Sequence, residues 1–171
     1  TREKCMSLFL CIALIIVAMS MSTVSYASIG GNCILYLNMN EGEGYTAEDE
    51  SGNDNDGDIS EGVSWTTGKV GSALSFDGVS GYVDCGNDVS LDTTDEITIE
   101  MWVKRTGDGS GVTPGIISKR DNGWGLIWHV GDALYTRIYQ GDGTQINSGQ
   151  ISNALTLGKW YHIALVADGT N

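Results

Sequence analysis

A period of two in the apolar residues constrains the fold of this sequence more than any other feature. Over residues 96–104, every second position carries an apolar side chain: Ile97, Ile99, Met101 and Val103. Successive side chains of a strand point to opposite faces of a sheet, so one face of this segment is apolar and the other is mixed. We therefore expect a strand in a half-solvated sheet.

The same pattern predicts more strands along the chain. They cover residues 33–40, 73–77, 82–84, 116–118, 124–130, 134–140 and 160–167. Clusters of Gly, Asn, Asp and Ser typical of tight turns lie between them, and no stretch after Ala27 sustains a capped helical period. The sequence therefore predicts an all-β fold, an antiparallel sandwich or barrel.

Residues 1–27 have the layout of a secretory signal. Arg2 and Lys4 precede an apolar run, residues 8–19, and Ser25 and Ala27 place small residues at −3 and −1 of a cleavage site. An uncleaved membrane anchor is the alternative, since the surrounding uncharged stretch is just long enough to span a bilayer. We expect cleavage, which leaves one exported domain, residues 28–171, outside the cell or on its surface. Contact with a membrane is expected only where the segment is retained.

The charge balance limits the partners of this domain. The chain has 22 Asp and Glu against 9 Lys and Arg, a net charge of −13. Binding to nucleic acid or anionic lipid without sequence specificity needs Lys and Arg to neutralise phosphate. We therefore expect no nucleic-acid partner.

Two cysteines, Cys33 and Cys85, remain after cleavage of the signal. An even pair in an exported chain predicts a disulfide, which would stabilise the domain by about 4 kcal/mol at most through loop closure. Two independently buried thiols are the alternative.

Five sequence blocks occur in a fixed order. They are 35–44 (LYLNMNEGEG), 49–57 (DESGNDNDG), 68–86 (GKVGSALSFDGVSGYVDCG), 95–104 (DEITIEMWVK) and 158–171 (GKWYHIALVADGTN). Together they resemble the laminin-G-like, concanavalin A-like jelly-roll domains of secreted proteins. The resemblance implies an antiparallel two-sheet jelly-roll sandwich that serves as a noncatalytic carbohydrate-binding or adhesive module, often with a structural calcium ion. The family pattern normally continues with further strands after residues 168–171, so we expect this chain to be an incomplete piece of a longer reading frame.

The resemblance places a candidate calcium site in the second block. Asp49, Asn53 and Asn55 lie in a D-x-S-G-N-x-N-x-G pattern that is similar to the family turn associated with calcium. Oxygen-rich, glycine-punctuated loops suit calcium, although the spacing does not fit an EF-hand. The alternative is an Asx-rich turn held by its own side-chain hydrogen bonds.

Aromatic residues suggest a carbohydrate site, because sugar rings stack on Trp and Tyr faces. Trp124 follows a tight turn, and Tyr135, Arg137 and Tyr139 share one side of a predicted strand. A polysaccharide or glycoconjugate is therefore the expected ligand, and a cell-surface protein is the alternative partner. These residues can also be ordinary core and edge fillers, the interpretation we favour for Trp102 and Trp160.

No residues form a recognisable catalytic set. Glu96 and Glu100 share a face of one strand but are about 13 Å apart, beyond the separation of a glycosidase carboxylate pair. His129 and His162 lie within strands and have no nucleophile motif beside them. We expect a recognition module; a structural or protein-adhesive spacer, or the accessory domain of a glycoside hydrolase, are the alternatives.

Overall fold

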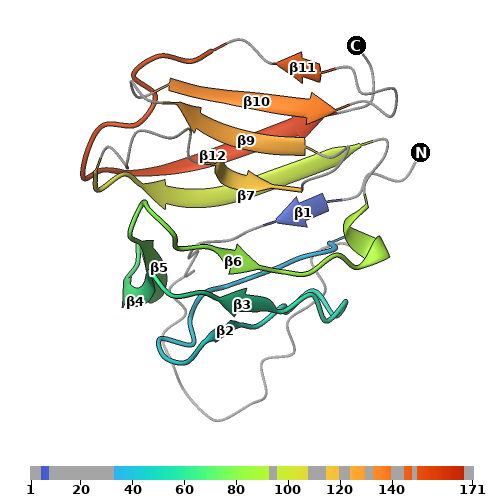
Figure 1. The fold of residues 1–171 in the computed structure, drawn as a ribbon, viewed down its shortest axis with the longest axis vertical. Coiled ribbons are helices and arrows are strands. Elements are labelled where there is room, and N and C mark those ends of the chain that lie inside the picture. Colours follow the sequence, from blue (N-terminus) through green and yellow to red (C-terminus); the bar gives the residue numbers. More distant parts are fainter. Residues whose placement is uncertain are drawn as a thin grey trace, which may run out of the picture.

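The computed structural model describes residues 33–92, 96–107, 115–119, 124–129, 133–139, 145–147 and 150–167, and the short strand 5–7. The predicted signal segment lies outside the described residues except for that strand. The described elements are β1 (Cys5–Ser7), β2 (Thr46–Ala47), β3 (Gly57–Ile59), β4 (Val63–Thr67), β5 (Ser72–Phe76), β6 (Val83–Asp84), the 3-10 helix η1 (Val89–Leu91), β7 (Ile97–Lys104), β8 (Gly115–Ser118), β9 (Trp124–His129), β10 (Ala133–Tyr139), β11 (Gln145–Asn147) and β12 (Trp160–Ala167). The chain folds as an all-β jelly-roll sandwich (Figure 1).

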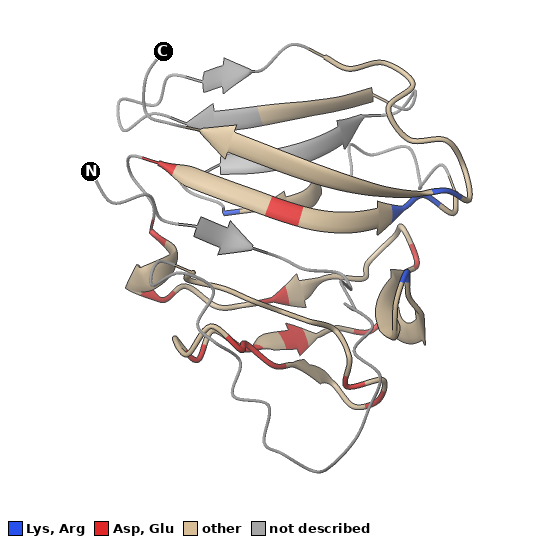
Figure 2. Ribbon diagram, turned by 180° about the vertical axis from the view of Figure 1, so that it is seen from behind, with Lys and Arg blue, Asp and Glu red and all other residues tan. Residues whose placement is uncertain are grey.

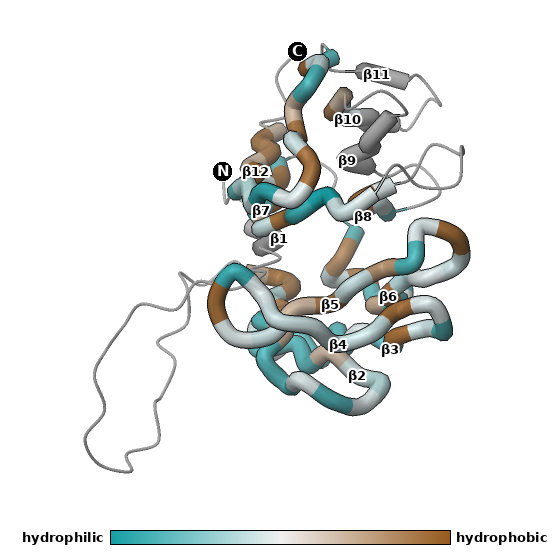
Figure 3. Tube along the Cα trace, turned by 90° about the vertical axis from the view of Figure 1, so that its left-hand side faces the viewer, coloured by the Kyte–Doolittle hydropathy of each residue, from teal (hydrophilic) through white to brown (hydrophobic). Residues whose placement is uncertain are grey.

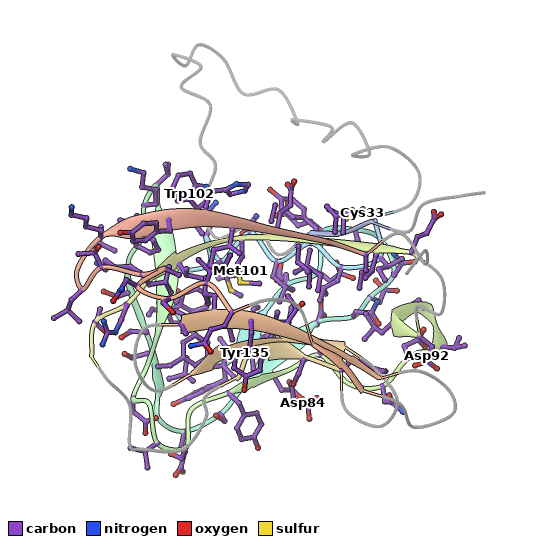
Figure 4. All side chains as sticks on the ribbon, turned by 90° about the horizontal axis from the view of Figure 1, so that it is seen from above. Cys33, Asp84, Asp92, Met101, Trp102 and Tyr135 are labelled. Atoms are coloured by element: carbon purple, nitrogen blue, oxygen red, sulfur yellow. The ribbon has the colours of Figure 1, made fainter. Side chains whose placement is uncertain are left out.

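Two sheets form the layers of the sandwich. In the first, β12 pairs antiparallel with the whole of β7, and β1 pairs parallel with the other edge of β7. The second has the order β11-β10-β9-β8. Seen from above, β7 and β12 form one layer and β9 and β10 the other; Met101 lies between them and Trp102 on the outer side (Figure 4).

Short strands complete the lower part of the molecule in Figure 1. One three-stranded sheet has the order β2-β3-β6, and β4 and β5 form a hairpin beside it. Apolar and hydrophilic residues are interspersed along the described trace (Figure 3). In the described part of the chain, no helix is long and apolar enough to cross a membrane.

The alternation predicted for residues 96–104 is confirmed. Ile97, Ile99 and Met101 are 5%, 1% and 2% exposed, whereas Trp102 is half-buried and Lys104 is exposed. The apolar residues of β7 therefore face the core, and the strand presents its polar and aromatic residues on the outside.

The prediction of one continuous strand over residues 33–40 is wrong. This segment makes isolated bridges at Cys33 and at Leu37, the latter with Asp49, and Met39 has a φ of 57°, which breaks the extended backbone. Leu35 and Leu37 are nonetheless buried, so the segment contributes to the core without pairing along its length.

Most of the other predicted strands are found within one or two residues of their expected bounds. The strand 160–167 is found as β12 with the predicted bounds. The sequence interpretation missed β1, β2, β3, β4 and β11, four of which have only two or three residues.

Candidate functional site

The acidic turn that was predicted to bind calcium is centred on Asp49. Its Oδ1 accepts hydrogen bonds from the N–H groups of Tyr36 (2.8 Å) and Ser51 (2.9 Å). Its Oδ2 accepts from the Ser51 hydroxyl (2.8 Å) and from the N–H of Asn55 (3.0 Å). A carboxylate offers about four acceptor positions, so these donors use the capacity of Asp49.

Asn53 and Asn55 extend the same network. The Asn55 side-chain amide donates to the carbonyl of Ile34 (2.9 Å) and to the Ser90 hydroxyl (3.0 Å), and Asn55 is 3% exposed. The Asn53 amide donates to the carbonyl of Cys33 (3.1 Å). These bonds tie the turn to the extended segment before it.

The three predicted calcium residues therefore lie together, in an Asx-rich turn held by hydrogen bonds. Coordination by Asp49 would require breaking some of those bonds, and within the described residues no three His, Cys, Asp or Glu side chains are grouped as metal ligands. Calcium would therefore bind Asp49 only after this turn rearranges. Calcium binding stays a prediction.

The structure differs from the sequence prediction at the cysteines, because Cys33 and Cys85 are both thiols in it. The Cys33 sulfur contacts the carbonyl of Leu35 at 3.5 Å, and Cys85 packs against the core. Burial, followed by the nearby carboxylates of Asp84 and Asp49, raises the pKa of the Cys85 thiol to about 11. The disulfide between Cys33 and Cys85 stays a prediction.

The strand carboxylate Glu100 has no acidic neighbour on β12. Glu100 lies opposite Ala164 of β12, whose remaining residues on that face are Trp160, His162 and Val166, so β12 places no acid beside it. Glu50 lies in the acidic turn region, where its own burial and the charges of Glu41 and Glu48 raise its pKa.

An aromatic and cationic surface lies on the outside of β7 and β12. The rings of Trp102 and His162, which are paired across the two strands, are 5.3 Å apart between centroids. The Lys69 Nζ stands 5.4 Å from the Trp102 ring centroid, and the Lys104 Nζ stands 4.9 Å from that of Trp160. We call these five residues the outer face.

The four residues predicted to bind carbohydrate come from β9 and β10. Tyr135, Arg137 and Tyr139 alternate along β10 and share a face of the sheet. The register pairs Trp124 with Ile138, and directly opposite residues share a face, so Trp124 belongs to the other face. By register, the four residues are divided between the two faces of this sheet, and carbohydrate binding by them stays a prediction.

Sequence reasoning missed the outer face as a unit. The period of two placed Trp102 away from the core, but nothing in the sequence indicates that Lys69, in the turn between β4 and β5, reaches its ring. The pairing of Trp160 with Lys104 follows from the β7–β12 register, which the sequence does not supply.

Comparison with known proteins gives one match. Residues 76–171 match the family model Laminin_G_3, described as the concanavalin A-like lectin/glucanases superfamily. No curated protein and no solved structure matches the chain at a significant level. The matched residues include β7 and β12, so the outer face lies almost wholly within them.

Proposed function

Because this chain belongs to the concanavalin A-like lectin/glucanases superfamily, we propose that it is a noncatalytic, exported recognition module that binds carbohydrate. Membership of the superfamily supports a lectin-like or adhesive module. The proposal adds two specific points. The ligand is a carbohydrate, and the N-terminal segment directs export of the protein.

The position of Trp102 is the observation that carries the proposal. Its indole ring lies outside the core layer and packs against His162, which is exposed. Trp160 lies on the same face of the sheet, one diagonal step away across the strands. Neighbouring aromatic rings on an accessible sheet face provide flat surfaces for the apolar side of sugar rings.

A protein-adhesive role is the second candidate, and the apolar end of the same sheet face favours it. Val166 is 68% exposed and Ala164 is also exposed, both on the outer side of β12. A protein partner could cover these side chains, whereas a sugar would gain little from them.

A glycan panel distinguishes the two candidates. The full chain is probed against immobilised neutral and acidic polysaccharides, and release of reducing sugar is measured in the same samples. Saturable binding without sugar release supports the recognition module. Sugar release would contradict the noncatalytic assignment, and absence of binding to every polysaccharide would favour the protein-adhesive candidate.

A further inference from the structure

Positive charge gathers at one end of the β7–β12 sheet in an otherwise strongly acidic protein. Lys69, Lys104, Arg105 and Lys159 are four of the nine Lys and Arg residues of the chain. Figure 2 shows blue residues at the end of β7 and in the turn of the β4–β5 hairpin, while red residues are frequent around β2, β3 and β6. Positive charge is therefore concentrated at this end of the sheet, although acidic residues also lie on β7.

Lys69 and Lys104 are the cations that lie against the aromatic rings. Both are exposed, and each ammonium group stands over an indole ring at about the distance of a cation–π contact. An ammonium group has three hydrogen-bond donors with which it can bind an anion. Arg105 has a different role, because its guanidinium donates to the carbonyls of Gly107 and Leu155 and so holds the adjoining loop.

We propose that the outer face binds an acidic polysaccharide that carries uronate groups. This inference rests on the proposed carbohydrate-binding function and names its ligand class and its surface. Lys69 and Lys104 would each turn from the indole ring to bind a carboxylate, and the sugar rings would then stack on the uncovered faces of Trp102 and Trp160.

A uronate polymer fits this surface better than a nucleic acid does. Double-stranded DNA carries one charge per ~1.7 Å of axis, and a protein of net charge −13 repels such a dense polyanion. A polyuronate carries only one carboxylate per sugar ring, so the two lysines neutralise a larger share of the charge on the ligand segment that they contact. Glu100 lies on the same side of β7 as Trp102 and adds a repulsive charge beside the site.

The test uses a matched pair of ligands and the full chain. Decagalacturonate is compared with its fully methyl-esterified form, which keeps the sugar rings and lacks the charges, in calcium-free buffer. Lys69→Gln/Lys104→Gln removes the two cations, and Lys119→Gln is the control, since Lys119 pairs with Asp92 away from this face. We expect the double variant to lose at least about tenfold in affinity for decagalacturonate and most of its salt dependence.

Two further variants separate stacking from charge. Trp160→Leu keeps an apolar side chain but removes the indole ring, so it should weaken binding of both the acid and the ester. Glu100→Gln removes the repulsive charge, so it should strengthen binding of the acid alone. Thermal melting checks that each variant is folded.

The possible results have distinct meanings. Preference for the acid that the lysine variants abolish and the control keeps supports the inference. Equal binding of acid and ester, unaffected by the lysine variants, overturns the inference while carbohydrate binding stands. No binding of any polysaccharide removes the proposed function as well, and equally tight, lysine-dependent binding of a dT oligonucleotide overturns the choice of a uronate ligand.

Discussion

The carboxylate of Asp49 accepts a hydrogen bond of 2.8 Å from the backbone N–H of Tyr36, thirteen residues earlier in the chain. This bond joins the acidic turn to the extended core segment, which lacks a full sheet partner. The Asp49 side chain therefore accepts a backbone hydrogen bond that a neighbouring strand would accept in a regular sheet.

Asp49→Ala should destabilise the domain by about 3 kcal/mol. The substitution removes the acceptor from the N–H groups of Tyr36, Ser51 and Asn55, and buried donors without acceptors are costly. Urea denaturation measures the loss. Asp54→Asn is the control, because Asp54 is exposed and Asn tolerates its φ of 58°; a loss of the same size in the control would contradict the role of Asp49.

Calcium should not change the melting temperature while Asp49 keeps its present bonds. Each carboxylate oxygen of Asp49 already accepts two hydrogen bonds, so a calcium ion would bind Asp49 only by displacing some of these bonds. Melting curves with excess calcium and with a chelator provide the measurement. A rise with calcium that Asp49→Asn removes would establish the calcium site expected from the family resemblance and show that the turn rearranges.

Asp77 should make stability depend on pH in the acidic range. Backbone N–H groups of Val79, Gly81 and Ser80 donate to its carboxylate and lower its pKa from 3.8 to about 2. The unfolded chain therefore binds the proton more readily, and the contribution of Asp77 is present above pH 3.8 and is lost as the pH falls toward 2. Urea denaturation across this range should show the wild type and Asp77→Asn converging in stability; parallel curves would contradict the prediction.

Trp124→Ala and Tyr135→Ala should affect glycan retention differently. The β9–β10 register places the two residues on opposite faces of the sheet, so a ligand lying on one face contacts only one of them. Affinity electrophoresis in gels that contain the bound polysaccharide measures retention. We expect at most one of the two variants to lose retention, and equal losses in folded variants would contradict the register argument.

Alkylation should be much slower at Cys85 in the folded chain than in the unfolded chain. With a pKa of about 11, the Cys85 thiol supplies little thiolate at pH 8, and we expect a rate about a hundredfold lower than in concentrated urea. Peptide mapping after a timed iodoacetamide pulse gives the rate, which should rise as the pH approaches 11. Protection of Cys33 and Cys85 together, relieved only by reductant, would instead establish the predicted disulfide.

Local pattern was enough to predict the main strands. The alternation through Ile97, Ile99 and Met101 fixes which face of β7 is buried, and β12 was predicted at its observed bounds. The strand expected at 33–40 failed because the positive φ of Met39 and the side-chain acceptor Asp49 replace strand pairing there. The alternation of apolar and polar residues indicates neither of these two features.

The candidate site depended more on tertiary structure. Trp102 could be placed outside the core from its position in the alternation. The approach of Lys69 depends on how the β4–β5 hairpin packs beside β7, and the separation of Trp124 from Tyr135 depends on a register that spacing does not define. Contacts between distant segments are therefore what the sequence could not supply.

The parallel pairing of β1 with β7 bears on the order of events during synthesis. Cys5 is in register with Thr98, so the contact cannot form until β7 has left the ribosome, about 5 to 20 s after β1 at ordinary elongation rates. Throughout that interval residues 5–7 have no pairing with β7. Removal of residues 1–27, the cleavage predicted from the sequence, would leave the Thr98–Glu100 edge of β7 open to pairing with another strand.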